Sequence, residues 1–531
     1  MPERPGSARL GVAAYAGATF LAFPHPVFGG VLDLGLLFAW LSPLALLLAL
    51  RGLSPRAAAR RGFLAGLVAH AAILHWIYVV TVRYGHAPVA VGVLAPVGLA
   101  AYVALFTAAF AAAYAWLSAR GLASPLATAA LWTVVDWLRS CVFTGFPWAT
   151  LGYAQHANPA LLGLAPWTGV YGLSFVTVLG ASGALAAWRD LRRDGRPGRG
   201  AVAALGAVAF CAGAGLASQL SVRDAEGERV RVAVLQGNID QGVKWSPEWF
   251  ESTLETYLDL TREAAAAGAQ LVVWPESALP AAVEVDGDAR DLLARLARGA
   301  NVSLVVGAVG IEAGGAGEPP HVFDSAFVVA PDGTPQERYD KTHLVPFGEY
   351  VPFQELLGSI LSAVARGIAT IGVTPGAEPR AIAVPLPGPE GRSVTVGIPI
   401  CYELLFPDLV RRFARDGAEL LLAITNDAWY GRTGAPYQFL AITALRAAET
   451  GLWTARAANT GVSAIIDGRG RVREQTRIFE RAWLVADLPR RPAREGATFY
   501  VRHGDWFAVA CAAGVLGLGA LGLSGVRRSH G

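Results

Sequence analysis

The stretch SVTVGIPICYELLFPD, residues 393–408, places a lone cysteine between an alternating apolar run and a polar helix start. The alternating β-branched residues before the cysteine predict a buried strand, and Pro407 with Asp408 is typical of the first turn of a helix. A thiol near a helix N-terminus lies at its positive end, which favours the reactive thiolate. We therefore predict that Cys401 is a nucleophile, with an inert buried cysteine at a strand end as the alternative.

The composition excludes an ordinary soluble protein. The chain has 531 residues, of which 53% are hydrophobic, and its mean hydropathy is +0.41. One globular core does not require so much apolar sequence, so part of the chain is expected in lipid. The net charge is only +3 and no basic run interleaves with aromatic residues, which argues against nucleic-acid binding. The four cysteines lack metal-ligand spacing, so we predict no disulfide framework, no metal site and no cofactor.

Apolar runs predict a polytopic α-helical membrane domain of about eight spans. The runs lie at 8–24, 31–50, 62–82, 88–118, 123–138, 160–187, 200–220 and 506–525. We divide the chain into a membrane domain at 1–221, an α/β domain at 222–504, and a last span with its tail at 505–531. A cleaved signal peptide is the alternative for the first run, but the next span would still anchor the chain.

The distribution of arginines predicts the orientation of these spans. One set of loops carries fourteen arginines, whereas the alternate loops carry only Arg83 and Arg139. Because loops rich in basic residues stay in the cytoplasm, we expect both termini to be cytoplasmic. The α/β domain then lies outside, which in a bacterium is the periplasmic face of the inner membrane.

Residues 222–504 alternate strand and helix patterns, which is typical of an α/β domain. Predicted strands lie at 230–236, 270–274, 303–309, 322–330, 393–400, 419–424 and 463–466. Predicted helices lie at 247–267, after the cap Ser246, at 288–298 and at 437–449.

Three strand ends in this domain carry reactive side chains: Glu276, Lys341 and Cys401. Lys244 and Lys341 are the only lysines among 44 basic residues, so a generic surface cation at either position would be expected to be arginine. Glu276 follows an apolar strand, where desolvation is expected to raise its pKa towards that of a general base. The alternative for each charged residue is an ordinary solvated side chain.

The order and local context of these three residues resemble the Glu-Lys-Cys triad of the nitrilase, or carbon-nitrogen hydrolase, superfamily. With the membrane spans, the chain is similar to the apolipoprotein N-acyltransferase family within it. The resemblance covers nearly the whole chain, most specifically in GFPWATLGYAQ (145–155), QGNIDQGVKW (236–245), VVWPESALP (272–280), KTHLVPFGEYVP (341–352), PICYELLFPD (399–408) and TNDAWYG (425–431). One departure is Phe323-Asp324-Ser325, where the family pattern is expected to read Tyr-Asn-Ser. We expect this to alter only a contact behind the site.

The resemblance implies an α-β-β-α sandwich for the α/β domain and a two-step acyl transfer. Glu276 would take the thiol proton, Cys401 would attack the ester of a phospholipid acyl donor, and Lys341 with backbone N–H groups would stabilise the oxyanion. The acceptor would be the α-amine of a diacylglyceryl-modified apolipoprotein. The matching also assigns supporting roles: Glu349 would position the charged pair, Tyr402 and Glu403 would shape the pocket, and Trp245 would close over the substrate. Their alternatives are a cap, a core aromatic and surface charges.

Two segments suggest contact with the lipid bilayer. Val351–Val373 is apolar with few charges and could rest on the bilayer, or else form a buried helix. Residues 141–167 form an outer loop that could frame the entry of acyl chains, or else belong to an aromatic belt.

Two rival functions remain open from the sequence alone. A membrane-tethered nitrilase-type amidase would use the same triad with water as acceptor. A transporter would need ionisable residues inside the spans, for which Asp33, Asp136, His70 and His75 give little support.

Overall fold

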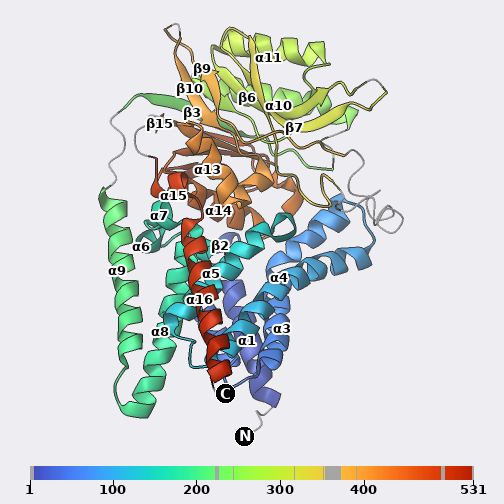
Figure 1. Ribbon diagram of the computed structural model, residues 1–531. Coiled ribbons are helices and arrows are strands. Elements are labelled where there is room, and N and C mark those ends of the chain that lie inside the picture. Colours follow the sequence, from blue (N-terminus) through green and yellow to red (C-terminus); the bar gives the residue numbers. More distant parts are fainter. Residues whose placement is uncertain are drawn as a thin grey trace.

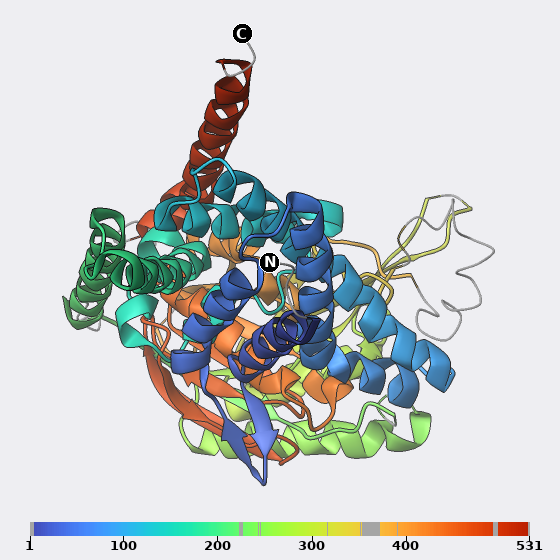
Figure 2. The ribbon, with the colours of Figure 1, turned by 90° about the horizontal axis from the view of Figure 1, so that it is seen from below.

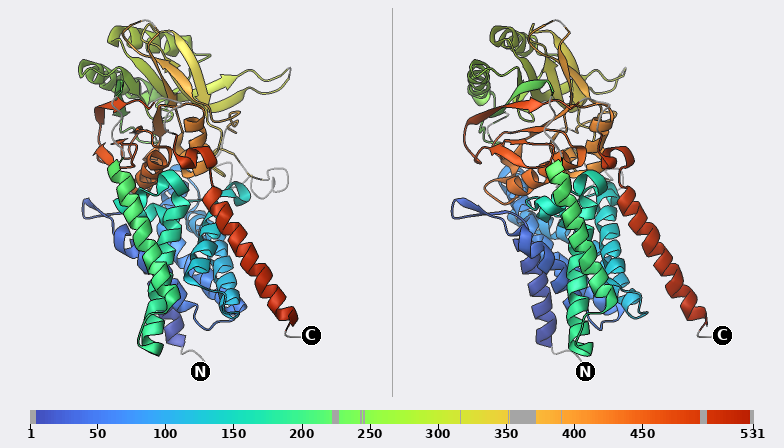
Figure 3. Two further views of the ribbon diagram at one scale, coloured as in Figure 1. Left: turned by 60° about the vertical axis from the view of Figure 1, so that its left-hand side comes forward. Right: turned by 90° about the vertical axis from the view of Figure 1, so that its left-hand side faces the viewer.

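A layered α/β domain stands on one end of a helical bundle in the computed structural model (Figure 1). The structure describes residues 5–221, 227–242, 244, 246–315, 317–350, 352, 372–389, 391–491 and 497–528. Helix α1 begins and helix α16 ends at the far end of the bundle, away from the α/β domain (Figure 3).

Helices lie at all eight predicted spans: α1 (Pro5–Leu21), α2 (Gly35–Ala49), α3 (Pro55–Ile73), α4 (Val89–Ser118), α5 (Pro125–Cys141), α8 (Val170–Asp194), α9 (Arg199–Ser221) and α16 (Trp506–Arg528). Among the described residues, six of these helices are long and apolar enough to cross a membrane, namely α3, α4, α5, α8, α9 and α16. Helix α2 is apolar but has only 15 residues, and α1 has 17. The bundle fits the predicted helical membrane domain, seen end-on in Figure 2.

The predicted span at 160–187 begins too early. The short helices α6 (Pro159–Leu162) and α7 (Ala165–Thr168) occupy its first residues, and Gly169 separates them from α8 with a φ of 64°. A Cβ at this glycine would lie 2.6 Å from the ring of Tyr500. The chain therefore turns here because only glycine combines the backbone angle with this close approach.

The α/β domain contains two β-sheets, one of seven strands and one of six. The first sheet has the order β15 (Ala482–Pro489), β3 (Arg229–Gln236), β4 (Leu271–Val273), β6 (Ser303–Glu312), β7 (His321–Val329), β8 (Pro335–Asp340), with β5 (Leu279–Ala282) beside β6. The second has the order β14 (Val472–Gln475), β13 (Ala464–Ile466), β12 (Thr454–Ala458), β11 (Leu420–Thr425), β10 (Ser393–Gly397), β9 (Ile382–Pro385). Strands β3, β4 and β6 run parallel, as do β10, β11 and β12. Their carboxyl ends therefore gather at common edges.

The two sheets face each other and helices cover both outer faces, as Figure 1 shows. Alternate residues of β3, such as Val232 and Val234, pack with Val396 of the other sheet, whereas Leu235 packs with residues of helices α10 (Pro247–Ala266) and α11 (Gly287–Ala300). Helices α13 (Pro407–Arg415) and α14 (Ala435–Thr450) cover the second sheet. This arrangement confirms the expected α-β-β-α sandwich.

Strands lie at all seven predicted positions, but the sequence pattern missed β5, β9, β12, β14 and β15. Strand β12 carries the fully buried Arg456, whose guanidinium donates to Asp427 at 2.8 Å. A buried arginine breaks the apolar pattern from which strands are predicted. All four residues of β14 are exposed, so it has no apolar face to detect.

The outer loop 141–167 connects the bundle to the sandwich. Trp148 packs against Trp76 with ring centroids 4.8 Å apart and against Phe439 of α14 at 5.6 Å, and it donates to Gln438 at 2.8 Å. Buried aromatic pairs of this kind each contribute about 0.5–1.5 kcal/mol beyond their buried area. The loop therefore holds the second sheet, through α14, against one end of the helical bundle.

Candidate active site

Cys401 begins a short turn, η5 (Cys401–Leu405), which follows β10. The backbone of Cys401 has a φ of 46°, a left-handed conformation that is rare for residues other than glycine. The turn η5 is a 3-10 helix, so a helix begins at Cys401 as predicted, and α13 follows at Pro407. The predicted preference for the thiolate was wrong, however. Burial raises the pKa of Cys401 well above its ordinary value, and the charge of Glu276 adds to this while Lys341 opposes it. The resting thiol is therefore protonated and requires a base.

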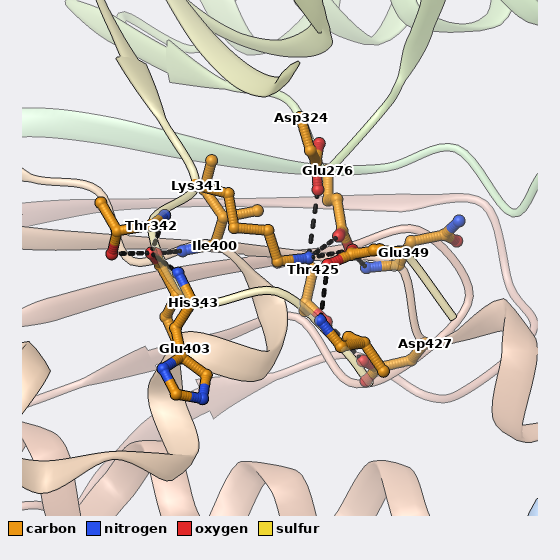
Figure 4. A network of polar contacts seen from close by, with 12 residues as sticks. Glu276, Asp324, Lys341, Thr342, His343, Glu349, Ile400, Glu403, Thr425 and Asp427 are labelled. Atoms are coloured by element: carbon orange, nitrogen blue, oxygen red, sulfur yellow. Dashed lines mark hydrogen bonds and ion pairs between the residues drawn. The ribbon is translucent and has the colours of Figure 1, made fainter. Parts of the chain in front are cut away.

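Lys341 follows the last residue of β8 and its side chain is fully buried. Figure 4 shows its ammonium group between three carboxyl groups. The distances from Nζ are 3.0 Å to Glu276, 3.1 Å to Asp324 and 2.5 Å to Glu349. Burial lowers the pKa of Lys341, but these neighbours outweigh it and hold the pKa well above its usual range. Lys341 is therefore a permanent cation with all three N–H donors engaged.

The same three carboxyl groups lie close enough together to share a metal ion. The Nζ atom of Lys341 already lies within hydrogen-bond distance of all of them. The lysine thus supplies the positive charge that a metal ion would otherwise supply to this cluster.

Glu276 lies just beyond the end of β4 and its side chain is only 8% exposed. One carboxyl oxygen accepts from Lys341, and the other accepts from the backbone N–H of Asn426 at 2.7 Å. Burial acts to raise the pKa of Glu276, as predicted, but Lys341 and the hydrogen bonds outweigh it, so the net pKa is lowered. The predicted upward shift was wrong. Glu276 is ionised at neutral pH and can accept a proton from Cys401.

Two of the predicted supporting residues contact the site in different ways. Glu349 accepts from Lys341 and from the backbone N–H of Val345 at 2.8 Å, so it restrains the lysine as expected. Tyr402 donates to the carbonyl oxygen of Gly145 at 3.2 Å and therefore ties the nucleophile turn to the bundle. Trp245 and the main part of the apolar segment Val351–Val373 lie outside the described residues.

The buried carboxyl group of Glu403 accepts hydrogen bonds from two segments of the site. One of its oxygens accepts from the hydroxyl of Tyr339 at 2.7 Å and from the backbone N–H of Thr342 at 2.7 Å. The other accepts from the backbone N–H of Ile400 at 2.8 Å. Because Thr342 follows Lys341 and Ile400 precedes Cys401, this carboxyl group fixes the lysine and the nucleophile relative to each other.

The comparison with known proteins decides the family. An apolipoprotein N-acyltransferase of Geobacter metallireducens is 40% identical over 510 residues, which cover 94% of this chain and 92% of that protein. This chain belongs to the apolipoprotein N-acyltransferase family. A second family member, from Nitrosomonas europaea, is 36% identical over 98% of this chain and 97% of its own length.

The family models match both parts of the chain. The apolipoprotein N-acyltransferase N-terminal domain matches residues 16–183, and the carbon-nitrogen hydrolase domain matches residues 231–497. Among solved structures, a mutant of the Nesterenkonia AN1 amidase from the nitrilase superfamily has 22% identity and a TM-score of 0.37 over 53% of this chain and 96% of the amidase.

Membership of the apolipoprotein N-acyltransferase family identifies the protein as an enzyme, an acyltransferase whose carbon-nitrogen hydrolase domain is joined to membrane helices. It favours acyl transfer over the amidase alternative, because the N-terminal membrane domain of this family is matched as well as the hydrolase domain.

Sequence reasoning missed three contributors to this site. Asp324 was expected behind the site, yet it bonds Lys341 directly. The backbone N–H of Asn426 reaches Glu276 from the end of β11; its run TNDAWYG was singled out without a role. Lys244 was singled out as a lysine without a role, and it is buried and donates to the carbonyl oxygen of Glu276 at 3.2 Å. Burial lowers its pKa to about 8. The rarity of lysine in this chain was the signal for both lysines.

Gly307 of β6 provides a test of how tightly Glu276 is placed. A Cβ at Gly307 would lie 2.2 Å from the carbonyl oxygen of Pro275 and 2.7 Å from the Cα of Glu276. We expect Gly307→Ala to push Glu276 away from Lys341, at a stability cost of about 1–3 kcal/mol, and to remove most acyl transfer. Thermal unfolding and transfer rate should be measured together.

Gly299 is the matched control for this substitution. It lies in α11, and a Cβ there would meet nothing within 4 Å. Gly299→Ala should keep the parent activity and stability. Parent-like transfer by Gly307→Ala would show that the position of Glu276 is less constrained than the close approach indicates.

Proposed function

We propose that this enzyme transfers a fatty acyl chain from a membrane phospholipid to the N-terminal α-amine of a diacylglyceryl-cysteine lipoprotein, through a thioester on Cys401. The observation that carries the proposal is the burial of an ionised Glu276, a cationic Lys341 and a protonated Cys401 in one site. This site belongs to a sandwich that packs on apolar helices.

In the first step, Glu276 accepts the proton of Cys401 while Sγ attacks the ester carbonyl carbon of the phospholipid. The tetrahedral intermediate then collapses, the ester C–O bond breaks, and Glu276 returns the proton to the departing lysophospholipid oxygen. The acyl chain remains on Cys401 as a thioester.

In the second step, the α-amine of the lipoprotein attacks the thioester carbonyl carbon. Glu276 accepts a proton from the attacking nitrogen, the C–S bond breaks, and the thiolate takes that proton back. The products are an amide-linked acyl chain and the free thiol. Lys341 and backbone N–H groups stabilise the oxyanion in both steps.

Mass spectrometry of Cys401 after incubation with phospholipid tests this proposal. We expect an acyl adduct that disappears when a diacylglyceryl peptide is added and that reappears as an amide on the peptide. Release of free fatty acid without amide formation would support a hydrolase instead, and no adduct on Cys401 would refute the thioester.

The membrane orientation is a separate proposal. We infer that both termini are cytoplasmic and that the sandwich is periplasmic at the inner membrane, because fourteen arginines lie in one set of loops and two in the other. Helix α1 begins and helix α16 ends on the side of the bundle opposite the sandwich (Figure 1), as this orientation requires.

A reporter that is active only in the periplasm checks the orientation. Inserted near Gly315, in the loop between β6 and β7, it should be active. Fused at Gly531 it should be silent, and a cytoplasmic reporter should give the opposite pattern. Activity of the periplasmic reporter at Gly531 would contradict the proposed orientation.

A further inference from the structure

The buried cluster around Lys341 has more acidic groups than its charge can balance. Glu276, Asp324 and Glu349 each place an oxygen within 3.1 Å of the single ammonium group. Their side chains are 8%, 11% and 18% exposed. Even with the second buried cation Lys244 nearby, three ionised carboxylates would leave uncompensated negative charge, which is strongly unfavourable away from water. At least one of the three must therefore carry a proton.

The hydrogen bonds identify which one carries it. Both oxygens of Glu276 accept an N–H bond, and so do both oxygens of Glu349. Asp324 differs, because Oδ2 accepts from Lys341 while Oδ1 is buried without a partner among the described residues. Carboxyl oxygens of Asp324 and Glu276 lie within 4.8 Å of each other. Two carboxyl groups can hydrogen-bond only if one of them donates a proton.

We propose that Asp324 is a positioning residue held as a neutral carboxylic acid, which donates its O–H to Glu276 and releases Lys341 to the substrate oxyanion. This inference rests on the proposed acyl transfer through Cys401. It assigns Oδ1 of Asp324 as the donor and Oδ2 as the carbonyl oxygen that accepts from Lys341.

The proposal resolves a conflict in the role of Lys341. An ammonium group has three N–H donors, and all three are engaged by carboxyl oxygens in the resting site. Lys341 can stabilise an oxyanion only by exchanging one of these bonds. The ammonium is attracted to an ionised carboxylate by a full negative charge, which a neutral Asp324 lacks, so the bond to Asp324 is the one that exchanges.

The charges around Asp324 agree with this assignment. Burial raises its pKa well above the usual range, Lys341 opposes this, and the negative charges of Glu276 and Glu349 add to it. Lys244 is a further cation, and its charge attracts the negative charge of an ionised Asp324. On the neighbouring strand, Arg338 and Asp340 pair with each other at 2.9 Å. A group with a raised pKa keeps its proton below that pKa, so the function of Asp324 should be lost as pH rises through it.

The test is the rate at which phospholipid acylates Cys401 in a single turnover of the full-length enzyme, from neutral to alkaline pH. In Asp324→Asn the amide N–H₂ replaces the O–H donor and the amide oxygen replaces Oδ2. We expect this variant to acylate within a few-fold of the parent at neutral pH. We also expect it to keep its rate at alkaline pH, where the parent loses it. Lys244 titrates in both proteins, so the ratio of their rates isolates Asp324.

Asp340→Asn is the matched control, because Asp340 is a carboxylate on the adjacent strand that pairs with Arg338 instead. Its pH profile should have the shape of the parent profile. The proposal is overturned if Asp324→Asn loses acylation at neutral pH, as an ionised carboxylate would require, or if its alkaline loss equals that of the parent.

A second measurement does not depend on activity or on the folding of a variant. The infrared C=O band of a protonated carboxyl group, recorded on parent enzyme with isotope-labelled aspartate, should be present at neutral pH and disappear at alkaline pH. Its absence at neutral pH would overturn the proposal. A parent enzyme that never acylates Cys401 would instead refute the proposed function, so the two failures are distinguishable.

Discussion

Cys401→Ala is expected to abolish the acyl-enzyme and with it the transfer of the acyl chain to the amine. The methyl group of alanine has no lone pair with which to attack an ester carbonyl carbon, so no covalent acyl-enzyme can form at this position. Folding and membrane insertion should be retained because the substitution removes a single atom. Mass spectrometry of the protein after incubation with phospholipid measures the result.

The three remaining cysteines are the controls for this prediction. Cys141 is exposed, Cys211 is half-buried and Cys511 is buried, and all three are free thiols. Alanine at each of these positions should leave acyl-enzyme formation largely intact. A Cys401→Ala protein that still forms an acyl adduct would move the nucleophile elsewhere and end the proposed mechanism.

Lys341→Arg is expected to retain folding and membrane insertion but to lose most activity, by about 10²–10³-fold, the loss that accompanies removal of one oxyanion donor. The Nζ atom of Lys341 lies 2.5–3.1 Å from three carboxyl groups on different segments. A planar guanidinium is larger, spreads its charge and binds acceptors in a fork. It cannot meet three convergent carboxyl groups and then turn one N–H towards an oxyanion.

Single-turnover acylation of Cys401, with thermal unfolding in parallel, measures this loss. Arg338→Lys is the matched control, since it makes the reverse exchange on β8, the strand that precedes Lys341, where Arg338 pairs with Asp340 outside the site. It should acylate at nearly the parent rate. Lys244→Arg, which the sequence suggested as a mild comparison, is expected to be harmful because Lys244 is buried against Glu276. If Lys341→Arg acylates within a few-fold of the parent, the catalytic role of this lysine is wrong.

The sequence by itself predicted the family, the helical membrane domain and the residues of the proposed triad. Apolar runs long enough to span lipid are visible without a structure, because each span is a local property of the chain. The rarity of lysine drew attention to Lys244 and Lys341, because the preference of this chain for arginine over lysine is visible in its composition. The seven predicted strands could be located because apolar side chains recur along them in the pattern of residues buried on the face of a sheet.

The tertiary structure decided the charge state of the site. Sequence context gave burial around Glu276 and so an upward pKa shift, but the net shift is downward, chiefly because the charge of Lys341, far away in the chain, lies against its carboxyl group. The predicted preference of Cys401 for the thiolate was also wrong, because burial and the charge of Glu276 raise its pKa more than Lys341 lowers it. Electrostatic energies depend on distances between groups that the fold brings together. For that reason, the choice of Asp324 as the protonated carboxyl could be inferred only once three carboxyl groups from separate segments had been placed around one ammonium group.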